Sequence, residues 1–310
     1  MRVYHSIEQF PSDIKTTLTI GTFDGVHKGH KHVLKRLNET AKKEGSESVL
    51  LTFYPHPRHV LYPDNQELKL LNTIEEKIEE LKKSGLQHFV IHEFTKEFSR
   101  TKSVNFIRDL LVNKLKMNHM VVGYDHHFGR NREGSYEELK ELSELYNFKL
   151  EQIPPQDEGD VTVSSTKIRK LLGSGDVKKA NVYLGYAYAI NGRVVKGNKI
   201  GRTINFPTAN ILVENDWKLI PADGVYAVKL KLGEEQYFGM LNIGKRPTIT
   251  DKQHAIEVHI FDFSKDIYGS KLKIELVKRI RDEKQFDSLG ALQKQLKIDE
   301  NNCRKHFGVL

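Results

Sequence analysis

The sequence predicts a mixed α/β chain with a Rossmann-like parallel-sheet domain followed by a small antiparallel β-barrel domain with a closing helix. The chain has 310 residues, a length that suits two domains. Strand-like and helix-like segments alternate through the first half, which favours a parallel sheet covered by helices on both faces. Short β-like stretches separated by Gly, Pro and Asn follow residue 186, which favours a small barrel. We place the boundary near Leu184, giving domains 1–183 and 184–310.

The first half is the more regular part of the pattern. Its helix at 30–43 carries Val33, Leu34 and Leu37 on one face, and Gly45 follows as a stop signal. Ligands of such sheets bind beyond the carboxyl ends of the strands, so we expect a site there. The expected strands are 18–20, 49–53, 89–91, 120–123 and 149–153, and the expected helices are 30–43, 73–83, 103–115, 136–146, 165–172 and 176–184.

The second half shows shorter segments and more turn residues. A closing helix is expected at 289–296, after the last of the β-like stretches. We see no internal repeat and no low-complexity tract. The expected strands are 186–195, 224–232, 237–243, 256–261 and 272–279.

Composition limits the classes of protein that fit this chain. Hydrophobic residues make up 38%, enough for a buried core, and Cys303 is the one cysteine, which excludes an intramolecular disulfide and argues against a Cys-based zinc site. The longest apolar run is far shorter than a membrane span, and the N-terminus has no signal-peptide pattern. We therefore expect a soluble, cytoplasmic protein with no membrane partner and no evident obligate protein partner.

The net charge of +8 comes from 49 Lys and Arg against 41 Asp and Glu. Such an excess attracts phosphates, although an ordinary solvated surface explains it as well. The basic residues are scattered and contain no run of five, so no nucleic-acid-binding tail is indicated. We expect no nucleic-acid partner.

The segment 21–30, GTFDGVHKGH, follows a strand and opens a helix. Gly21 lets a ligand approach the backbone, and a helix N-terminus attracts phosphate. His27 and His30 lie three residues apart at this terminus, where imidazoles can donate hydrogen bonds to a phosphate whose charge grows during a reaction. Capping or surface histidines are the simpler alternative, and a metal site lacks a supporting carboxylate cluster.

Three further polar segments follow strands or open a helix, at the same expected edge of the sheet. They are TFYPHP at 52–57, GYDHHFG at 123–129 and SSTKIR at 164–169. Taken singly, a Pro-rich turn, a Gly-bounded loop and a plain N-cap would explain them. A phosphate-binding P-loop at 129–134 is rejected because Ser135 stands where its lysine would be, and no Gly-x-Gly-x-x-Gly fingerprint follows a strand.

Together these four segments resemble the FMN adenylyltransferase domain of bacterial bifunctional FAD synthetases, and the 21–30 block resembles the signature of Class I synthetase-like nucleotidyltransferases. The resemblance implies that His27 and His30 are catalytic. Asp125 stands where the family often has Asn, which leaves the mode of flavin binding open. The implied flavin-binding residues are His56, Pro57 and Asp125, and the implied ATP-binding residues are Gly21, Phe23, Asp24, Gly25, His27, Gly29, His30, Ser164, Ser165, Thr166 and Arg169.

The second half carries its own set of polar residues in 192–210, GRVVKGNKIGRTINFPTAN. A glycine-punctuated basic loop can fold over phosphates, and the threonine hydroxyl and amide oxygen in its last four residues can help to hold Mg²⁺. A hairpin loop with a rigid Pro turn is the alternative. Glu257 lies in an alternating strand and shares a face with Ala255 and His259. A glutamate on the inner face of a barrel would be costly unless paired or catalytic, whereas an exposed strand residue is the simpler interpretation.

These segments, with DGVY at 223–226 and NIGKRPT at 242–248, resemble the riboflavin kinase domain. The resemblance implies that Glu257 is the base for the riboflavin 5′-hydroxyl and that Thr208 and Asn210 bind Mg-ATP and are the metal ligands. Asn205 precedes Phe206 where the family usually has glycine. The implied ATP-binding residues are Gly197, Lys199, Gly201, Pro207, Thr208 and Asn210, and the implied flavin-binding residues are Arg281, Glu283 and Phe286.

The two resemblances cover nearly the whole chain and imply a bifunctional enzyme of flavin cofactor synthesis. It would phosphorylate riboflavin to FMN in the C-terminal domain and adenylylate FMN to FAD, with release of pyrophosphate, in the N-terminal domain. Riboflavin, FMN, FAD and ATP are then its ligands, and Mg²⁺ its cofactor. A nucleotidyltransferase acting on another phosphate, and a flavin-sensing or nucleic-acid-binding regulator, are the alternatives.

Overall fold

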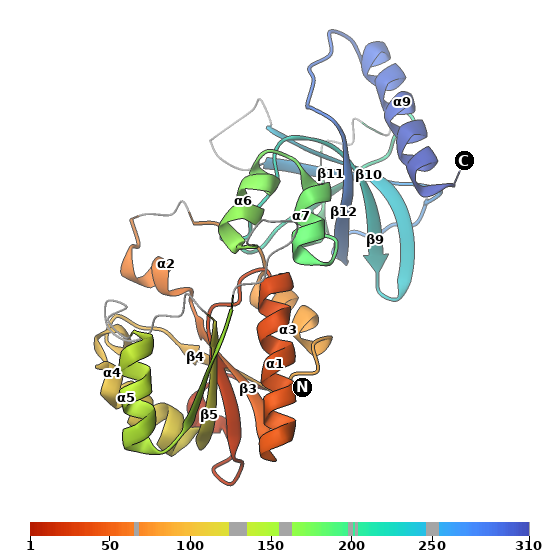
Figure 1. Ribbon diagram of the computed structural model, residues 1–310. Coiled ribbons are helices and arrows are strands. Elements are labelled where there is room, and N and C mark those ends of the chain that lie inside the picture. The colour runs from red at the N-terminus through yellow and green to blue at the C-terminus, as the bar shows by residue number, and fades with distance from the viewer. Residues whose placement is uncertain are drawn as a thin grey trace. The chain divides into compact units, whose positions relative to one another are not determined.

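The computed structural model describes residues 1–64, 68–123, 135–154, 163–197, 201, 204–245 and 254–309. Contacts divide the chain into two compact units, Met1–Ser164 and Ser165–Leu310 (Figure 1). A parallel sheet in the first unit and a closed antiparallel barrel in the second confirm the predicted α/β class.

The first unit is built on a six-stranded parallel sheet of order β1-β4-β3-β2-β5-β6. The order reverses at β2, because β3 and β5 lie on its two sides, and ligand sites of such sheets lie at the carboxyl ends of strands at this point. The short first strand is absent from the sequence prediction. The strands are β1 (Arg2–Tyr4), β2 (Thr16–Ile20), β3 (Glu47–Tyr54), β4 (His88–Glu93), β5 (Met117–Gly123) and β6 (Lys149–Ile153).

Helices cover both faces of this sheet, with α1 and α3 on one side and α4 and α5 on the other (Figure 1). Alternation along β3 explains the two layers: Leu50 packs with residues of α1 and α3, whereas Val49 and Leu51 pack with residues of η3 and α5. The expected helix at 103–115 begins as α and continues as a π-helix, η3. The helical elements are η1 (Ile7–Gln9), α1 (Lys28–Glu44), α2 (Pro57–Leu61), α3 (Ile74–Lys82), η2 (Phe98–Arg100), α4 (Ser103–Asn105), η3 (Phe106–Lys114) and α5 (Tyr136–Tyr146).

The second unit is a closed barrel of order β10-β11-β8-β7-β12-β9, with antiparallel pairing throughout. Helix α9 packs on it through Leu292, Leu296 and Cys303, and it extends well beyond the predicted 289–296. The elements are α6 (Ser165–Gly173), α7 (Val177–Leu184), β7 (Ala189–Val195), β8 (Ala209–Leu212), β9 (Gly224–Leu232), β10 (Glu235–Lys245), β11 (His254–Ile260), β12 (Lys271–Arg281) and α9 (Leu289–Phe307).

Helices α6 and α7 pack with the barrel, so the contact division at 164/165 precedes the sequence boundary placed at Leu184. Asn181 of α7 donates to the Leu276 carbonyl at 2.9 Å and accepts from the Tyr188 backbone at 2.8 Å. The Leu172 carbonyl of α6 accepts from the Ala222 amide at 3.0 Å. The functional boundary at 183/184 remains a prediction.

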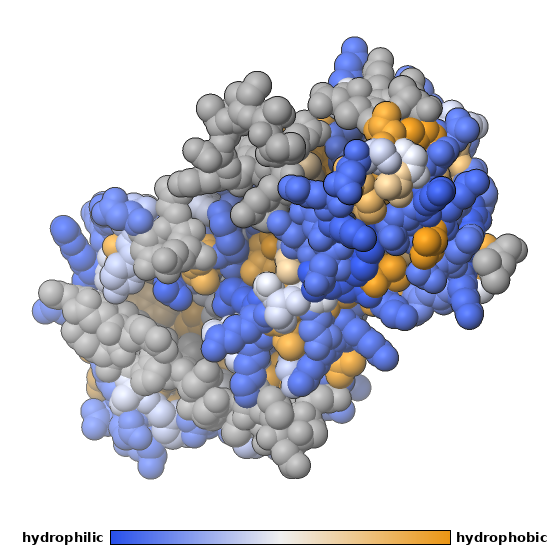
Figure 2. Space-filling model, turned by 90° about the horizontal axis from the view of Figure 1, so that it is seen from above, coloured by the Kyte–Doolittle hydropathy of each residue, from blue (hydrophilic) through white to orange (hydrophobic). Residues whose placement is uncertain are grey.

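The surface is polar over much of its area. Figure 2 shows one face on which hydrophilic residues predominate and hydrophobic residues appear in small groups. Across the described ranges of the chain, no helix combines the length and apolar character needed to span a membrane. The chain's one cysteine, Cys303, is buried in α9, and burial raises the pKa of its thiol to about 12.

Candidate active sites

The turn that joins β2 to α1 is strained. Phe23 has φ 44° and Val26 has φ 37°, left-handed values that are costly for side chains of this size. Gly21 is required by space, since a Cβ there would lie 2.9 Å from the Phe23 ring. Gly25 has φ 86°, which glycine adopts without strain. Strain of this kind persists only where surrounding contacts impose it.

Asp24 is one of those contacts. Its side chain is buried, and its carboxylate accepts hydrogen bonds from the backbone amides of Leu71, at 3.0 and 3.1 Å, and Asn72, at 3.3 Å. These bonds tie the turn to the segment that leads into α3. The carboxylate therefore stabilises the turn. The contact between Asp24 and ATP remains a prediction.

His27 and His30 form a stacked pair at the N-terminus of α1, with ring centroids 3.6 Å apart and planes 16° apart. His27 is the N-cap, and its Nδ1 accepts the backbone N–H of His30 at 3.3 Å. Because Nδ1 is an acceptor, a neutral His27 carries its proton on Nε2. The ring of Phe23 stacks on His30 from the other side, at 4.6 Å.

Burial holds the pKa of His30 well below its ordinary value of 6.5, and the charges of His27 and Lys77 lower it further. A neutral imidazole still donates one hydrogen bond. Among the described residues, Nδ1 of His30 is buried without a hydrogen-bond partner. Gly29 lies close beneath the pair, because a Cβ there would be 3.2 Å from Cε1 of His27.

The remaining predicted residues of this first site are placed less completely. His56 caps α2 directly after β3, the neighbour of β2, and its Nδ1 accepts the Arg58 amide at 3.2 Å, with Pro57 as the first helical residue. The structure thus brings 21–30 and 56–57 to the same sheet edge. Ser164 closes the first unit, whereas Ser165, Thr166 and Arg169 lie in α6 of the second. Asp125 lies outside the described residues.

A second cluster forms on the barrel, where four predicted residues meet. Thr208 Oγ1 donates to Glu257 Oε2 at 3.3 Å, and Glu257 of β11 pairs directly with Asn210 of β8. Gly197 packs on the same amide, since a Cβ there would lie 2.1 Å from Asn210 Nδ2. Four residues from three separate segments therefore form one polar cluster.

Glu257 lies on the outer face of the barrel strand β11, whereas its partner Asn210 is buried. Ile256, Val258 and Ile260 are buried, whereas Glu257 and His259 are only partly buried. The predicted sharing of a face by Ala255, Glu257 and His259 is confirmed by this alternation. Partial exposure, together with the hydroxyl of Thr208, lowers the cost of keeping a carboxylate there.

The segment that carries Thr208 is held by contacts that sequence reasoning missed. His259 Nδ1 bonds the Pro207 carbonyl at 2.7 Å, and its ring lies 5.4 Å from that of Phe206. Asn205 has φ 58°, a left-handed value that Gly and Asn adopt most readily. This conformation suits Asn as well as the glycine that the resemblance leads one to expect at this position.

Gly201 and Glu283 each lie in close contact with another segment of the barrel domain. A Cβ on Gly201 would lie 2.1 Å from the Phe206 carbonyl oxygen, so only glycine fits, and Lys199 lies outside the described residues. Glu283 lies directly over Gly244, where a Cβ would come within 1.8 Å of its Oε1.

Arg281 is bound to α9, and its predicted contact with the flavin remains a prediction. Its guanidinium donates to both carboxylate oxygens of Asp299, at 2.8 to 3.1 Å, and to the Asp282 carbonyl at 2.8 Å. Asp299 is buried, and Phe286 lies 5.7 Å from the guanidinium carbon. Sequence reasoning missed Asp299, because an acidic residue in an amphipathic helix carries no signal of burial.

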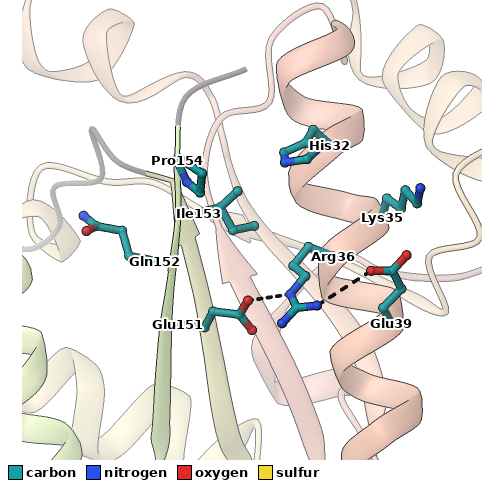
Figure 3. Close-up of a pocket in the computed structure, with 8 residues that line it drawn as sticks. All are labelled: His32, Lys35, Arg36, Glu39, Glu151, Gln152, Ile153 and Pro154. Carbon is teal, nitrogen blue, oxygen red and sulfur yellow. Dashed lines mark hydrogen bonds and ion pairs between the residues drawn. The ribbon is translucent and has the colours of Figure 1, made fainter. Parts of the chain in front are cut away.

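A hollow of about 220 Å³ lies between α1 and β6, and Figure 3 shows the residues that line it. Arg36 bridges Glu151 at 2.5 Å and Glu39 at 3.9 Å along its wall. None of the predicted site residues lines this hollow. Its lining consists of His32, Lys35, Arg36, Glu39, Glu151, Gln152, Ile153 and Pro154.

A parallel sheet with a histidine pair at its switch point is the arrangement of a nucleotidyltransferase, and the barrel with its Thr–Asn–Glu cluster is that of a kinase domain. Comparisons with known proteins agree: the FAD synthetase family matches residues 9–167, and the riboflavin kinase family matches residues 184–307. The chain belongs to the family of bifunctional riboflavin kinase/FMN adenylyltransferases.

Individual relatives match over almost their whole length. A bifunctional riboflavin kinase/FMN adenylyltransferase of Escherichia coli (strain K12) is 37% identical over 310 residues, covering 100% of this chain and 98% of the relative. One from Listeria monocytogenes is 38% identical over 300 residues, covering 96% and 95%. A crystal structure described as a macrolide-efflux protein from Streptococcus pneumoniae is 32% identical, covers 98% of each chain and superposes with a TM-score of 0.89.

Proposed function

We propose that the two reactions of this bifunctional flavin-synthesising chain divide between the two polar clusters. The histidine pair of the first unit serves adenylyl transfer from ATP to FMN, and the Thr208–Asn210–Glu257 cluster serves phosphorylation of riboflavin. The observation that supports the first assignment, adenylyl transfer, is the stacked histidine pair at the N-terminus of α1. There, imidazole hydrogen-bond donors and the positive end of the helix dipole can act on the same phosphate.

In the first reaction, an oxygen of the FMN phosphate attacks the α-phosphorus of ATP, and the bond to pyrophosphate breaks. Negative charge grows on the leaving pyrophosphate, and hydrogen bonds from His27 and His30 stabilise it. His30 serves as a neutral donor, which suits its lowered pKa. No covalent intermediate is needed. The roles of Ser165, Thr166 and Arg169 in binding phosphate, and of His56, Pro57 and Asp125 in binding the flavin, are part of this proposal.

In the second reaction, Glu257 takes the proton of the riboflavin 5′-hydroxyl as that oxygen attacks the γ-phosphorus of ATP, and ADP leaves. The hydroxyl of Thr208, 3.3 Å from the carboxylate, fixes the carboxylate's orientation. Glu283 and Phe286 contact the flavin. The ion pair between Arg281 and Asp299 supports a role for Arg281 in anchoring that segment to α9.

Mg²⁺ fits the residues of the barrel cluster. The Thr208 hydroxyl and the Asn210 amide lie beside Glu257, and such oxygen donors are the ligands that Mg²⁺ prefers. When bound, the ion neutralises charge on the ATP phosphates. The proposed reactions need only small molecules — riboflavin, FMN, FAD and ATP — and place the protein in the cytoplasm, where these compounds are made and used.

The experiment is chromatography of the flavins formed from riboflavin, ATP and Mg²⁺ by the purified protein. We expect FMN first and FAD later. FAD from supplied FMN without any product from riboflavin would contradict the kinase assignment, and FMN that never becomes FAD would contradict the adenylyltransferase assignment. A panel of other phosphate acceptors, including phosphopantetheine and glycerol phosphate, checks that FMN is the preferred substrate.

A further inference from the structure

Lys77 is a buried lysine of α3 that bonds the turn leading into the histidine pair. It lies on the face of α3 that also carries Ile74, Ile78 and Leu81, and only 8% of the residue is exposed. A lysine at such a position is costly to bury unless its ammonium is paired and hydrogen-bonded. Lys82, five residues further along the same helix, is exposed.

The ammonium of Lys77 finds its partner in the strained turn. Its Nζ donates to the Thr22 carbonyl oxygen at 2.6 Å, one residue before Phe23, where the left-handed stretch begins. Burial lowers the pKa of Lys77, and the negative charge of Asp24 opposes that shift. The turn is thus held from the α3 side at two points, through Thr22 by Lys77 and through Asp24 by the amides of Leu71 and Asn72.

The first turn of α3, which precedes Lys77, is itself held by hydrogen bonds. Thr73 caps α3 by accepting the Glu76 amide at 3.3 Å, and the Glu76 carboxylate accepts the Thr73 amide at 3.0 Å, which closes a capping box. Lys77 follows this box directly, so the helix fixes where its side chain starts. The charges that act on His30 are those of His27 from the start of α1 and Lys77 from α3, while Phe23 offers only an uncharged ring.

We propose that Lys77 is a positioning residue for adenylyl transfer: through its bond to Thr22 it holds the 22–26 turn, which leads into the His27–His30 pair, in its strained shape, and it places a positive charge at that turn. The proposal rests on the assignment of adenylyl transfer to that pair. Lys77 has two effects: its hydrogen bond shapes the turn, and its positive charge disfavours protonation of His30.

Three substitutions separate these two effects. Lys77→Met removes both the donor and the charge, Lys77→Gln keeps a donor without the charge, and Lys77→Arg keeps both. The exposed Lys82→Met is the matched control. For each full-length variant, kcat and the KM for ATP are measured for conversion of FMN to FAD. Riboflavin kinase activity of the same chain is the internal reference, and thermal unfolding followed by circular dichroism reports folding.

We expect kcat for FAD formation to fall by about tenfold or more in Lys77→Met, with the KM for ATP changed much less, because a misplaced donor pair acts on the transition state. Lys77→Gln should lose less, and Lys77→Arg should recover most of the rate. Kinase activity and Lys82→Met should match the wild type. Wild-type kcat in both neutral variants would overturn the proposal. An equal loss of kcat for FAD formation in Lys77→Arg and Lys77→Met would also overturn it.

A second readout is independent of catalysis. NMR titration of the His30 imidazole, assigned with a His30→Asn variant, should give a higher pKa in Lys77→Met and Lys77→Gln than in the wild type, because a repelling charge is gone. An unchanged titration would overturn the charge role of Lys77. A wild-type protein that fails to adenylylate FMN would refute the function of the pair, whereas this titration would still report the charge of Lys77. If Lys77→Met does not fold, Lys77→Gln decides both measurements.

Discussion

Nδ1 of His27 accepts the backbone N–H of His30, and the two imidazoles stack with centroids 3.6 Å apart. This relationship makes His27 both the cap of α1 and one half of the donor pair. It also fixes the neutral tautomer of His27, because an accepting Nδ1 leaves the proton on Nε2. The fold and the chemistry of the first site thus depend on the same hydrogen bond.

Replacing His30 with alanine should selectively remove FAD formation. Loss of one donor to a developing phosphate charge commonly costs about 10² to 10³ in rate. FMN formation from riboflavin should persist in the same preparation, since it depends on the barrel cluster. His32→Ala, at an exposed position of the same helix, is the control. The assay is FAD release from FMN and ATP, and a loss of less than threefold would contradict the assigned role.

The lowered pKa of His30 predicts a pH effect on stability. The unfolded chain binds a proton at His30 near pH 6.5, whereas the folded chain binds it only at lower pH. The unfolded state therefore holds more protons in this window, and stability falls as the pH drops below 6.5. The midpoint of thermal unfolding should fall less between pH 7 and pH 5 in His30→Asn than in the wild type. Equal slopes would contradict the buried, neutral state of His30.

Glu257→Gln should abolish most of the kinase activity and leave adenylylation of supplied FMN intact. Loss of a general base costs about 10² to 10⁴ in rate. The amide is nearly isosteric and keeps an oxygen beside Thr208, so the barrel should remain folded. Glu234→Gln, whose side chain is 96% exposed, is the matched control. Kinase activity within threefold of the wild type would exclude Glu257 as the base.

Asn205 offers a test of backbone strain at the barrel site. Asn205 has φ 58°, in the left-handed region. Asn205→Gly should therefore leave the free energy of unfolding nearly unchanged, whereas Asn205→Ala should lower it by about 1 kcal/mol, because alanine is disfavoured in this region. The alanine variant should also bind ATP more weakly through the 206–210 segment. Thermal unfolding and the KM for ATP in the kinase assay measure the two effects. Equal stability of the two variants would contradict this account.

The buried pair of Arg281 and Asp299 predicts a larger effect. Asp299→Asn leaves the Arg281 charge without its partner, and breaking a buried ion pair in this way costs about 3 to 5 kcal/mol. The 281–286 segment then loses its attachment to α9, so the KM for riboflavin should rise. Asp287→Asn, an exposed position next to the segment, is the control. Urea unfolding and kinase assays provide the measurements. An unchanged KM for riboflavin in Asp299→Asn would contradict a role of the Arg281–Asp299 pair in flavin binding.

Pattern was sufficient to predict the sheet and the barrel, and the family resemblance singled out Gly197, Thr208, Asn210 and Glu257, which the structure brings together. The strand β8 was missed because Ala209–Leu212 begins two residues after Pro207 and is too short to show alternation. Lys77 and Asp299 were missed for another reason. Each looks like an ordinary charged residue of an amphipathic helix, and only tertiary contacts reveal that it is buried and paired.

The central claim is that two separate sites on one chain carry out the two reactions. It is tested most directly by mixing the His30→Ala and Glu257→Gln proteins with riboflavin, ATP and Mg²⁺ and following the flavins by chromatography. The account predicts that His30→Ala alone accumulates FMN, that Glu257→Gln alone yields no product, and that the mixture forms FAD. Accumulation of FMN in the mixture without any FAD would contradict it.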